Sequence, residues 1–327
     1  MMNDAAAGTG TNLNRDRDPR PEARRRAWLE QRQALENARR KITLEGPVGF
    51  RRRARLDFAL TWFERLLRLS GWHGRGRANA LNITLKPLAL TLQTLPREFD
   101  GYRILQISDP HLDRLPELAE RIAALVRAVP VDVLILTGDY RDRHRDPPEP
   151  GLALLKPILD AVDPKDGRFA LLGNHDPAAA AAILEAMGLT VLLNQTVTLE
   201  RGGAALHLTG LDDVHSFFTE AARDALEEVH EGCRIAAVHS PEAADVAAKA
   251  GIDLYLCGHT HGGQICLPGG RPLLTQLHRC RAYSRGLWRH DAMIGYTSLG
   301  AGVVSMPIRF NCPPEVVLIT LHAPAPD

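Results

Sequence analysis

Short apolar runs that alternate with helical segments are the feature that most restricts the fold of this chain. From Arg103 onward, runs of five to seven residues have the character of strands, at 103–108, 132–137, 168–172, 204–210, 234–239, 252–257, 293–298 and 315–321. Helical segments lie between them, at 116–128, 152–162, 177–187, 216–229 and 241–249. This alternation predicts βαβ units and a largely parallel sheet, or a pair of sheets, covered by helices.

Five of the apolar runs are followed within two residues by a side chain able to bind a metal ion. The motifs are Asp109-Pro110-His111, Gly138-Asp139, Gly173-Asn174-His175-Asp176, His239, and Gly258-His259-Thr260-His261. Each motif alone has an ordinary interpretation as a turn or a helix cap. In α/β folds, however, ligands bind at the carboxyl ends of the strands, so neighbouring strands would bring these groups to one rim. Five coincidences of residue type and position therefore predict a metal site.

The residue types favour a site for two metal ions. A dinuclear site needs ligands for both ions and one group that bridges them, and Asp139, at a strand end before a turn, occupies that place. Mixed ligation by carboxylate, imidazole and amide oxygen suits Mn, Fe or Zn better than Mg.

Two local features predict how the ligands are presented. His259 and His261 are separated by one residue, so both rings would point to the same side of an extended segment. Pro110 is expected to restrict Asp109 to extended backbone geometry, and so to shape the turn that presents Asp109 and His111.

The first 77 residues differ in charge from the rest of the chain. Residues 1–77 hold 18 Lys and Arg against 9 Asp and Glu, whereas residues 78–327 hold 22 against 30. We expect a disordered tail at 1–20, a basic helical extension at 21–77 and one domain at 78–327.

An amphipathic helix is predicted at 56–69, within the basic extension. Its apolar face includes Phe58, Trp62, Phe63 and Leu66, and it follows Arg51, Arg52, Arg53 and Arg55. Such a helix can lie in an anionic membrane surface with its arginines among the headgroups, which predicts peripheral membrane contact through residues 51–70. The alternative is a helix that docks on the body of the same protein or on a second subunit.

Taken in order, the DxH, GD, GNHD, His and GHTH motifs resemble those of the calcineurin-like metallophosphoesterase superfamily. The flanking stretches LPREFDGYRILQISDPHL, GHTHGGQICLPG and RFNCPPEVVLITL look like those of a bacterial branch that contains membrane-associated phosphoesterases and UDP-2,3-diacylglucosamine hydrolase-like enzymes. The resemblance covers roughly residues 95–322. It implies an α/β fold, a four-layer β-sandwich flanked by helices. Pro110 departs from the larger apolar residue that the family usually has between the first two ligands.

The resemblance also implies a role for each motif residue. The metal ligands would form two sets with one bridging residue: Asp109, His111 and His261; Asn174, His239 and His259; and Asp139 as the bridge. His175 would bind the phosphoryl oxygen or protonate the leaving group. Asp142 and Asp176 would orient imidazoles or water molecules, with helix capping or a surface position as the alternative for each.

Residues outside these motifs carry weaker signals. Asp212 and Asp213 would either line the substrate cleft or cap the helix that follows them. The eight remaining histidines, His215 and His278 among them, are interpreted as structural or solvated.

The implied activity is hydrolysis of a phosphodiester or pyrophosphate bond. Two substrate classes remain open: lipid-linked or nucleotide-sugar substrates at a membrane surface, and small soluble phosphodiesters such as cyclic nucleotides. A catalytically silent scaffold fits less well, because all seven ligand positions and His175 are filled. The basic arm lacks a nucleic-acid-binding motif, so no nucleic acid partner is expected.

Localisation is predicted from three features of the sequence. The five cysteines are scattered without a CxxC spacing, and neither a signal peptide nor an uncharged apolar stretch of about 18 residues is found. These features favour a cytoplasmic protein, and the amphipathic helix adds the expectation of a peripheral position at the inner face of the membrane.

Overall fold

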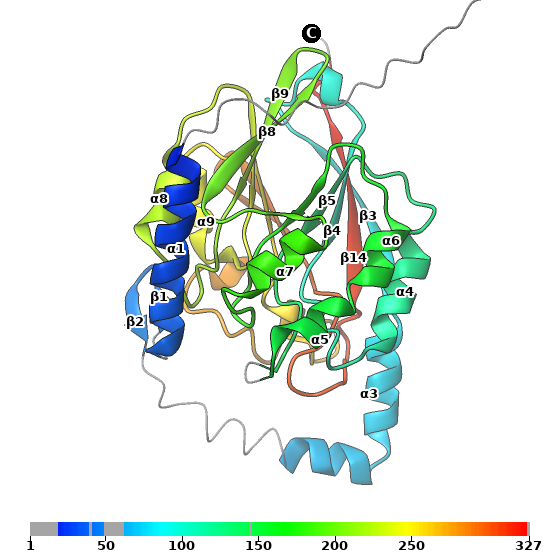
Figure 1. Ribbon diagram of the computed structural model, residues 1–327. Coiled ribbons are helices and arrows are strands. Elements are labelled where there is room, and N and C mark those ends of the chain that lie inside the picture. The colour runs from blue at the N-terminus through cyan, green and yellow to red at the C-terminus, as the bar shows by residue number, and fades with distance from the viewer. Residues whose placement is uncertain (1–18, 39–40, 49–61, 144–145, 326–327) are drawn as a thin grey trace, which may run out of the picture.

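The computed structural model describes residues 19–38, 41–48, 62–143 and 146–325 (Figure 1). The tail expected at 1–20 lies almost wholly outside these residues, as do Arg51, Arg52, Arg53, Arg55 and the first part, 56–61, of the amphipathic helix. Two six-stranded sheets face each other at the centre of the molecule, and helices cover their outer faces. The predicted four-layer α/β fold is confirmed.

The first sheet has a parallel centre and contains the strand that precedes Asp109. Strands β4 to β7 are parallel to one another, and β14 pairs antiparallel with β4 and parallel with β3. In spatial order its strands are β3 (Thr84–Thr91), β14 (Glu315–His322), β4 (Tyr102–Ile107), β5 (Val133–Leu136), β6 (Arg168–Ala170) and β7 (Thr190–Val191).

The second sheet is also parallel at its centre, with an antiparallel strand at each edge. In spatial order its strands are β12 (Gly286–His290), β13 (Met293–Thr297), β11 (Leu254–Cys257), β10 (Cys233–Ala237), β9 (Ala204–Gly210) and β8 (Gln195–Arg201).

Successive side chains along the buried strands alternate between two apolar layers, one between the sheets and one beneath the outer helices. In β4, Ile104 packs between the two sheets, whereas Leu105 and Ile107 face the outer helices of the first sheet. In β10, Ile235 faces the first sheet and Ala236 faces the helices of the second. Successive side chains of a strand point to opposite faces, and both faces here are covered, so these strands are mostly apolar on both faces.

Most of the predicted helices are present with shorter bounds. Those that cover the first sheet or its rim are α4 (Glu117–Val126), α5 (Pro148–Ala153), α6 (Lys156–Ala161) and α7 (Ala180–Ala186). Those that cover the second sheet are α8 (Glu220–Glu227) and α9 (Ala244–Lys249). Short 3₁₀ turns are η1 (Arg97–Phe99), η2 (Pro241–Ala243), η3 (His261–Gly263) and η4 (Arg281–Tyr283).

The N-terminal extension contributes several elements. Helix α1 (Pro19–Asn37) matches the helical character seen from residue 21, and a hairpin of β1 (Lys41–Thr43) and β2 (Gly46–Val48) follows it. Residues 62–69 are helical, as predicted, and α3 (Trp72–Leu81) follows them. Among the described helices, none is both long and apolar enough to cross a bilayer.

Candidate metal centre

The loop after β4 presents Asp109 and His111. Both residues have left-handed backbone, with φ of 51° at Asp109 and 38° at His111, so the expected extended geometry at Asp109 is wrong. Tertiary hydrogen bonds decide the conformation here. The Asp109 N–H donates to the Gly138 carbonyl at 3.0 Å, and the Asp109 carbonyl accepts from the Gly302 N–H at 2.9 Å. These bonds outweigh the local preference that a following proline imposes.

His259 and His261 are likewise not extended. Their φ angles are 70° and 51°, and His261 opens the turn η3, so the prediction of two rings on one side of an extended segment is wrong. The two rings instead enter different groups of side chains. Five residues of ligand type at this rim therefore have left-handed backbone: Asp109, His111, Asp139, His259 and His261. Strained backbone of this kind is concentrated at functional sites.

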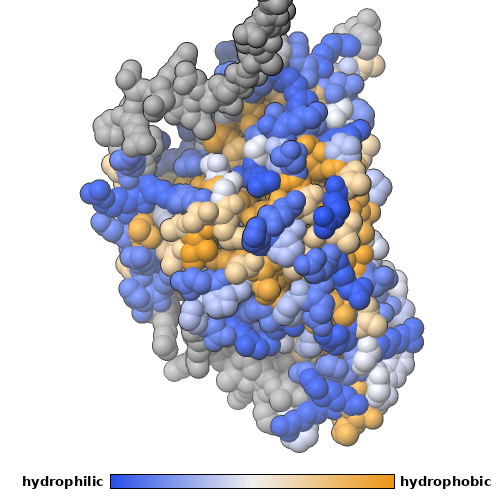
Figure 2. All heavy atoms as spheres, turned by 45° about the vertical axis from the view of Figure 1, so that its right-hand side comes forward, coloured by the Kyte–Doolittle hydropathy of each residue, from blue (hydrophilic) through white to orange (hydrophobic). Residues whose placement is uncertain are grey.

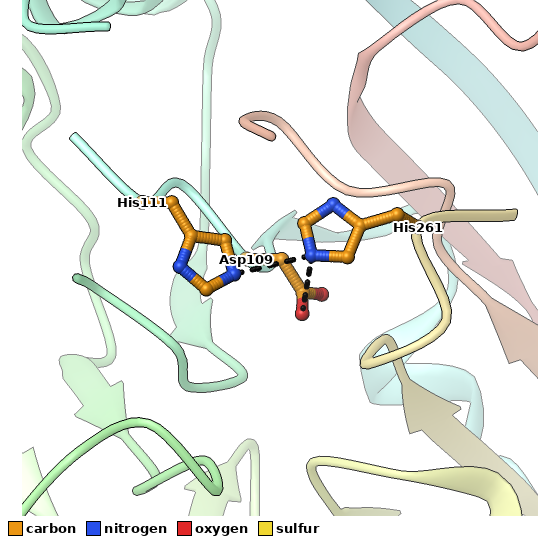
Figure 3. Close-up of side chains that lie close together, drawn as sticks. All are labelled: Asp109, His111 and His261. Atoms are coloured by element: carbon orange, nitrogen blue, oxygen red, sulfur yellow. Dashed lines mark hydrogen bonds and ion pairs between the residues drawn. The ribbon is translucent and has the colours of Figure 1, made fainter. Parts of the chain in front are cut away.

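Three side chains form what we call the first cluster: Asp109, His111 and His261 (Figure 3). All three are buried and point toward one another. Nε2 of His111 lies 3.1 Å from Nε2 of His261, which lies 3.5 Å from Oδ1 of Asp109. The cluster joins the loop after β4, in the first sheet, to the loop after β11, in the second.

The second cluster consists of Asn174, His239 and His259, and Asp139 lies beside it. Nε2 of His239 is the common neighbour: it lies 3.3 Å from Oδ2 of Asp139, 3.2 Å from Oδ1 of Asn174 and 3.3 Å from Nδ1 of His259. Nδ1 of His239 lies 2.8 Å from the Thr137 carbonyl, so Nδ1 donates and Nε2 is the ring atom that faces the cluster.

Asp139 lies between the two clusters. Its Oδ2 is 3.3 Å from Nε2 of His239 in the second cluster and 3.7 Å from Nε2 of His111 in the first. Its Oδ1 accepts a hydrogen bond of 2.8 Å from the backbone N–H of His175. Asp139 thus occupies the place that a bridging carboxylate needs.

The electrostatics of the clusters lower the pKa of two histidines, His259 and His261, and raise the pKa of a third, His239. Burial and the neighbouring rings of His215 and His239 hold the pKa of His259 well below its ordinary value. Burial, the His111 ring and the Arg309 guanidinium do the same to the pKa of His261. Burial alone would lower the pKa of His239, but the Asp139 and Asp109 carboxylates raise it well above its ordinary value. Because a metal ion binds the neutral ring, His259 and His261 are in the form that coordinates a metal, whereas a metal ion bound by His239 must displace a proton.

The geometry also fits metal ions. Bonds of about 2.1 Å to a tetrahedral ion place neighbouring ligand atoms about 3.4 Å apart, and the spacings within and beside the clusters, 3.1 to 3.5 Å, are close to this value. Buried nitrogen and oxygen donors packed at these spacings fit two neighbouring metal ions.

His175 lies next to the first cluster. Its ring is 5.0 Å from that of His111, and Nδ1 lies 3.0 Å from the Asp142 carbonyl oxygen. His111, Asp142 and His175 are close enough to share an ion themselves. The Asp142 carboxylate, however, forms an ion pair with Arg114, whose positive charge opposes a cation at that place.

Asp176 is neither a surface acid nor a cap at the start of α7. Its carboxylate accepts hydrogen bonds from three backbone N–H groups, those of Gly173, Asp139 and Tyr140. Asp176 therefore holds the loop after β5 against the loop after β6. Burial and the neighbouring Asp139 carboxylate raise the pKa of Asp176 to about 6.

Neither interpretation of Asp212 and Asp213 fits the structure. Both are buried, with Asp212 paired to Arg32 of α1, so neither lines an open cleft. Asp213 accepts hydrogen bonds from the N–H groups of His215 and Ser216, which closes a turn, but the N-cap of α8 is Thr219.

Sequence reasoning missed the position of two residues at this rim, His215 and Arg309. His215, interpreted as structural or solvated, lies with its ring centroid 4.1 Å from that of His259, and its Nδ1 is 2.6 Å from Oε2 of Glu242. Arg309 is fully buried and donates to the carbonyls of Leu299, Gly300 and Gly302. No motif surrounds these residues, because their partners lie far along the chain.

Known proteins resemble this chain in sequence. A sequence model described as calcineurin-like phosphoesterase matches residues 102–263. The uncharacterized metallophosphoesterase YkuE of Bacillus subtilis is 30% identical over 238 residues, which cover 70% of this chain and 82% of YkuE. YkoQ of the same organism, also an uncharacterized metallophosphoesterase, is 30% identical over 221 residues, 65% of this chain and 81% of YkoQ. The phosphodiesterase YaeI of Escherichia coli is 28% identical over 233 residues, 67% of this chain and 82% of YaeI.

Proposed function

The chain belongs to the calcineurin-like phosphoesterase family of phosphoric ester hydrolases, and we propose that it hydrolyses a phosphodiester or pyrophosphate bond with two divalent metal ions. The observation that carries this proposal is the position of the Asp139 carboxylate between two clusters of buried ligand-type side chains. We assign one ion to Asp109, His111 and His261, the other to Asn174, His239 and His259, and the bridge to Asp139. Imidazole-rich ligation favours Mn, Fe or Zn as the metal.

The contacts of His175 indicate which part this residue would take in the reaction. When bound, two divalent ions supply an activated water and offset negative charge on the phosphoryl oxygens. Because the Asp142 carbonyl can only accept, Nδ1 of His175 carries a proton, and Nε2 is the atom that would hold or release a proton toward the leaving oxygen. The His175 N–H also donates to Asp139, so the turn that carries His175 is fixed relative to the bridging carboxylate.

Activity on small substrates tests the proposal. Metal-free protein would be loaded with Mn, Fe(II) or Zn, and hydrolysis of bis- and mono-nitrophenyl phosphate measured against the number of ions bound. We expect turnover of the diester to rise with the second equivalent of metal. Turnover that is complete after one equivalent, or that needs no metal, would contradict a dinuclear site.

For the natural substrate we propose a lipid-linked pyrophosphate or diester at an anionic membrane surface. Support comes from the helical residues 62–69 and the start of α3, where the apolar side chains are exposed: Trp62 (48%), Phe63 (38%), Leu66 (61%), Leu69 (85%) and Trp72 (51%). Arg65 lies over the Trp62 ring and Arg75 over the Trp72 ring. Figure 2 shows hydrophobic and strongly hydrophilic side chains side by side at the lower end of the molecule, where Figure 1 places this helical segment.

The exposed segment is connected to the metal centre. The ring of Trp72 lies 6.0 Å from that of Phe310, and the Gly76 carbonyl accepts from the Arg309 N–H at 2.9 Å. Arg309 in turn donates to the His261 carbonyl. A membrane bound by this segment would lie near the loop that carries a predicted ligand, which suits a substrate held in the bilayer.

Vesicle sedimentation tests membrane contact. We expect the protein to bind vesicles that contain phosphatidylglycerol, through its arginines, and the Trp62→Ser, Leu66→Ser double variant to bind much less. Leu287→Ser, which changes a comparably exposed leucine on β12, is the matched control and should bind like the natural protein. Equal binding by the double variant, or no binding by the natural protein, would exclude the segment as a membrane anchor. In that case small soluble phosphodiesters become the favoured substrates.

A further inference from the structure

Arg32 of α1 is buried at the rim of the metal centre, although it comes from the N-terminal extension. Only 1% of its surface is exposed. Its guanidinium forms an ion pair with Asp212, and its Nη2 donates to the Asp176 carbonyl at 2.7 Å and weakly to the Gly173 carbonyl at 3.5 Å. A buried charge persists only where it is paired and hydrogen-bonded, so this environment is specific for an arginine.

The partners of Arg32 belong to the two sheets. Gly173 and Asp176 flank Asn174 and His175 in the loop after β6, in the first sheet. Asp212 lies after β9, in the second sheet, and begins the loop that ends near His215. Arg32 therefore links the loop after β6 to the loop after β9, close to the second cluster.

Neighbouring residues of α1 strengthen this connection. Nε1 of Trp28 donates to Oδ2 of Asp212 at 2.7 Å. Oε1 of Glu36 accepts from Nε of Arg32 at 2.8 Å and from the Ala178 N–H at 2.9 Å. The partners of Trp28 and Glu36 outside the helix are more than 140 positions away in the sequence, whereas the bond between Arg32 and Glu36 lies within α1. Helix α1 lies outside residues 102–263, which the family sequence model matches.

The hairpin after α1 completes the contact. The Ile42 N–H donates to the Ser216 carbonyl at 2.8 Å, and the Phe218 N–H donates to the Ile42 carbonyl at 2.9 Å. The Arg32 guanidinium also lies over the Phe217 ring, 3.6 Å from its centroid. Residues 213–218 are thus held on one side by β1 and on the other by Arg32.

We propose that Arg32 is a positioning residue of the metal centre, which holds the turn bearing Asn174 and His175 at the distance from His239 and His259 that the second metal ion requires. The expected effect of Arg32 on catalysis rests on the proposed function. The expected effect of Arg32 on metal binding does not depend on which substrate is hydrolysed. It assigns to the N-terminal extension a part in building the site.

Two variants distinguish a positioning role of Arg32 from the alternative that Arg32 only neutralises the charge of Asp212. Arg32→Lys keeps a positive charge near Asp212 but loses the planar fork that reaches Asp212 and the loop carbonyls together. The double variant Arg32→Met, Asp212→Asn removes both buried charges, so that no unpaired carboxylate remains to destabilise the fold. Arg25→Met is the matched control, since Arg25 lies on the same helix and pairs with Glu185, away from the turn at 173–176.

The measurements are metal content by mass spectrometry, thermal unfolding, and kcat and KM with bis-nitrophenyl phosphate at saturating metal. For both Arg32 variants we expect the affinity for the second ion to fall about 10- to 100-fold and kcat to fall at nearly unchanged KM, while the first ion is retained. Arg25→Met should match the natural protein in metal content and kcat.

Three outcomes would overturn the inference. Full retention of both ions and of kcat in the double variant would show that Arg32 only neutralises Asp212. Equal loss of both ions, or failure of both Arg32 variants to fold, would show that it supports the whole domain and not this turn. Lack of hydrolysis by the natural protein would contradict the proposed function instead, and the metal content of the variants would still test Arg32.

Discussion

The backbone N–H of His175 donates a 2.8 Å hydrogen bond to Oδ1 of Asp139, while Oδ2 of the same carboxylate lies between the two clusters. The carboxylate assigned as the bridge therefore also fixes the turn that carries the histidine assigned to catalysis. In the proposed mechanism, metal binding by Asp139 and proton transfer by His175 would therefore depend on the same carboxylate, which substitutions of single residues can test.

His175→Ala should lower kcat without changing metal content. Its ring contacts Asp142 and His111 and is not assigned to either ion, so the variant loses proton transfer, which contributes typically about 10²- to 10⁴-fold. Steady-state kinetics and metal analysis on the same preparation check this. His207→Ala, which changes a buried histidine held by Thr198 and Glu231, is the control and should keep kcat. A His175→Ala enzyme with natural kcat would remove His175 from the mechanism.

Gly173→Ala should damage the centre by sterics alone. A Cβ at this position would lie 2.1 Å from Oδ1 of Asp139 and 2.6 Å from its backbone N, so the carboxylate must move. We expect loss of metal and of most activity. Gly74→Ala, in α3, adds the same methyl group where nothing lies within 4 Å, and should leave metal content unchanged. If the two variants bind metal equally well, the close approach of Gly173 to Asp139 has no functional consequence.

Glu242→Gln should reduce stability in a pH-dependent way. Burial tends to raise the pKa of Glu242, but its hydrogen bond and charge interaction with His215, together with the N–H of His278, lower it below its ordinary value. A lowered folded-state pKa stabilises the protein above the unfolded value of about 4.3, and this contribution is lost as the pH falls through the folded value. The variant should be less stable at pH 7 by about 1 to 3 kcal/mol, and the difference should shrink below about pH 4. Urea unfolding at the two pH values measures this, and a difference that grows in acid would contradict it.

Removal of divalent metal should lower the melting temperature. Ions that bind only the folded chain stabilise it, by about 2.7 kcal/mol for each ion present at 100 times its dissociation constant. Thermal unfolding with and without a chelator should therefore show a clear shift for the natural protein and a smaller one for Gly173→Ala. Equal melting temperatures with and without chelator would mean that the clusters hold no ion.

The strands, and the positions of the five motifs at strand ends, were predictable from the sequence because local pattern determines them. The strand expected at 204–210 has those bounds in β9, and the five motifs follow β4, β5, β6, β10 and β11 as predicted. Strand β12 was missed because Gly286–His290 is an edge strand with mixed polarity, which is paired only through β13.

Other features depend on contacts that no local pattern reveals. Arg32 lies in a helix of polar composition, where an arginine is ordinarily solvated, and its burial results from Asp212, 180 residues away. The left-handed backbone at Asp109 likewise results from hydrogen bonds to Gly138 and Gly302, and the local preference of a residue before proline predicts the opposite.

The most direct test of the central claim is metal content and diester hydrolysis of Asp139→Asn beside the natural protein. An amide in place of the carboxylate keeps the size of the side chain but removes the charge that two cations would share. We expect the natural protein to bind two divalent ions per chain and to hydrolyse bis-nitrophenyl phosphate, and the variant to lose at least one ion and nearly all turnover. An Asp139→Asn protein that keeps both ions and the natural rate would contradict a dinuclear centre bridged by Asp139.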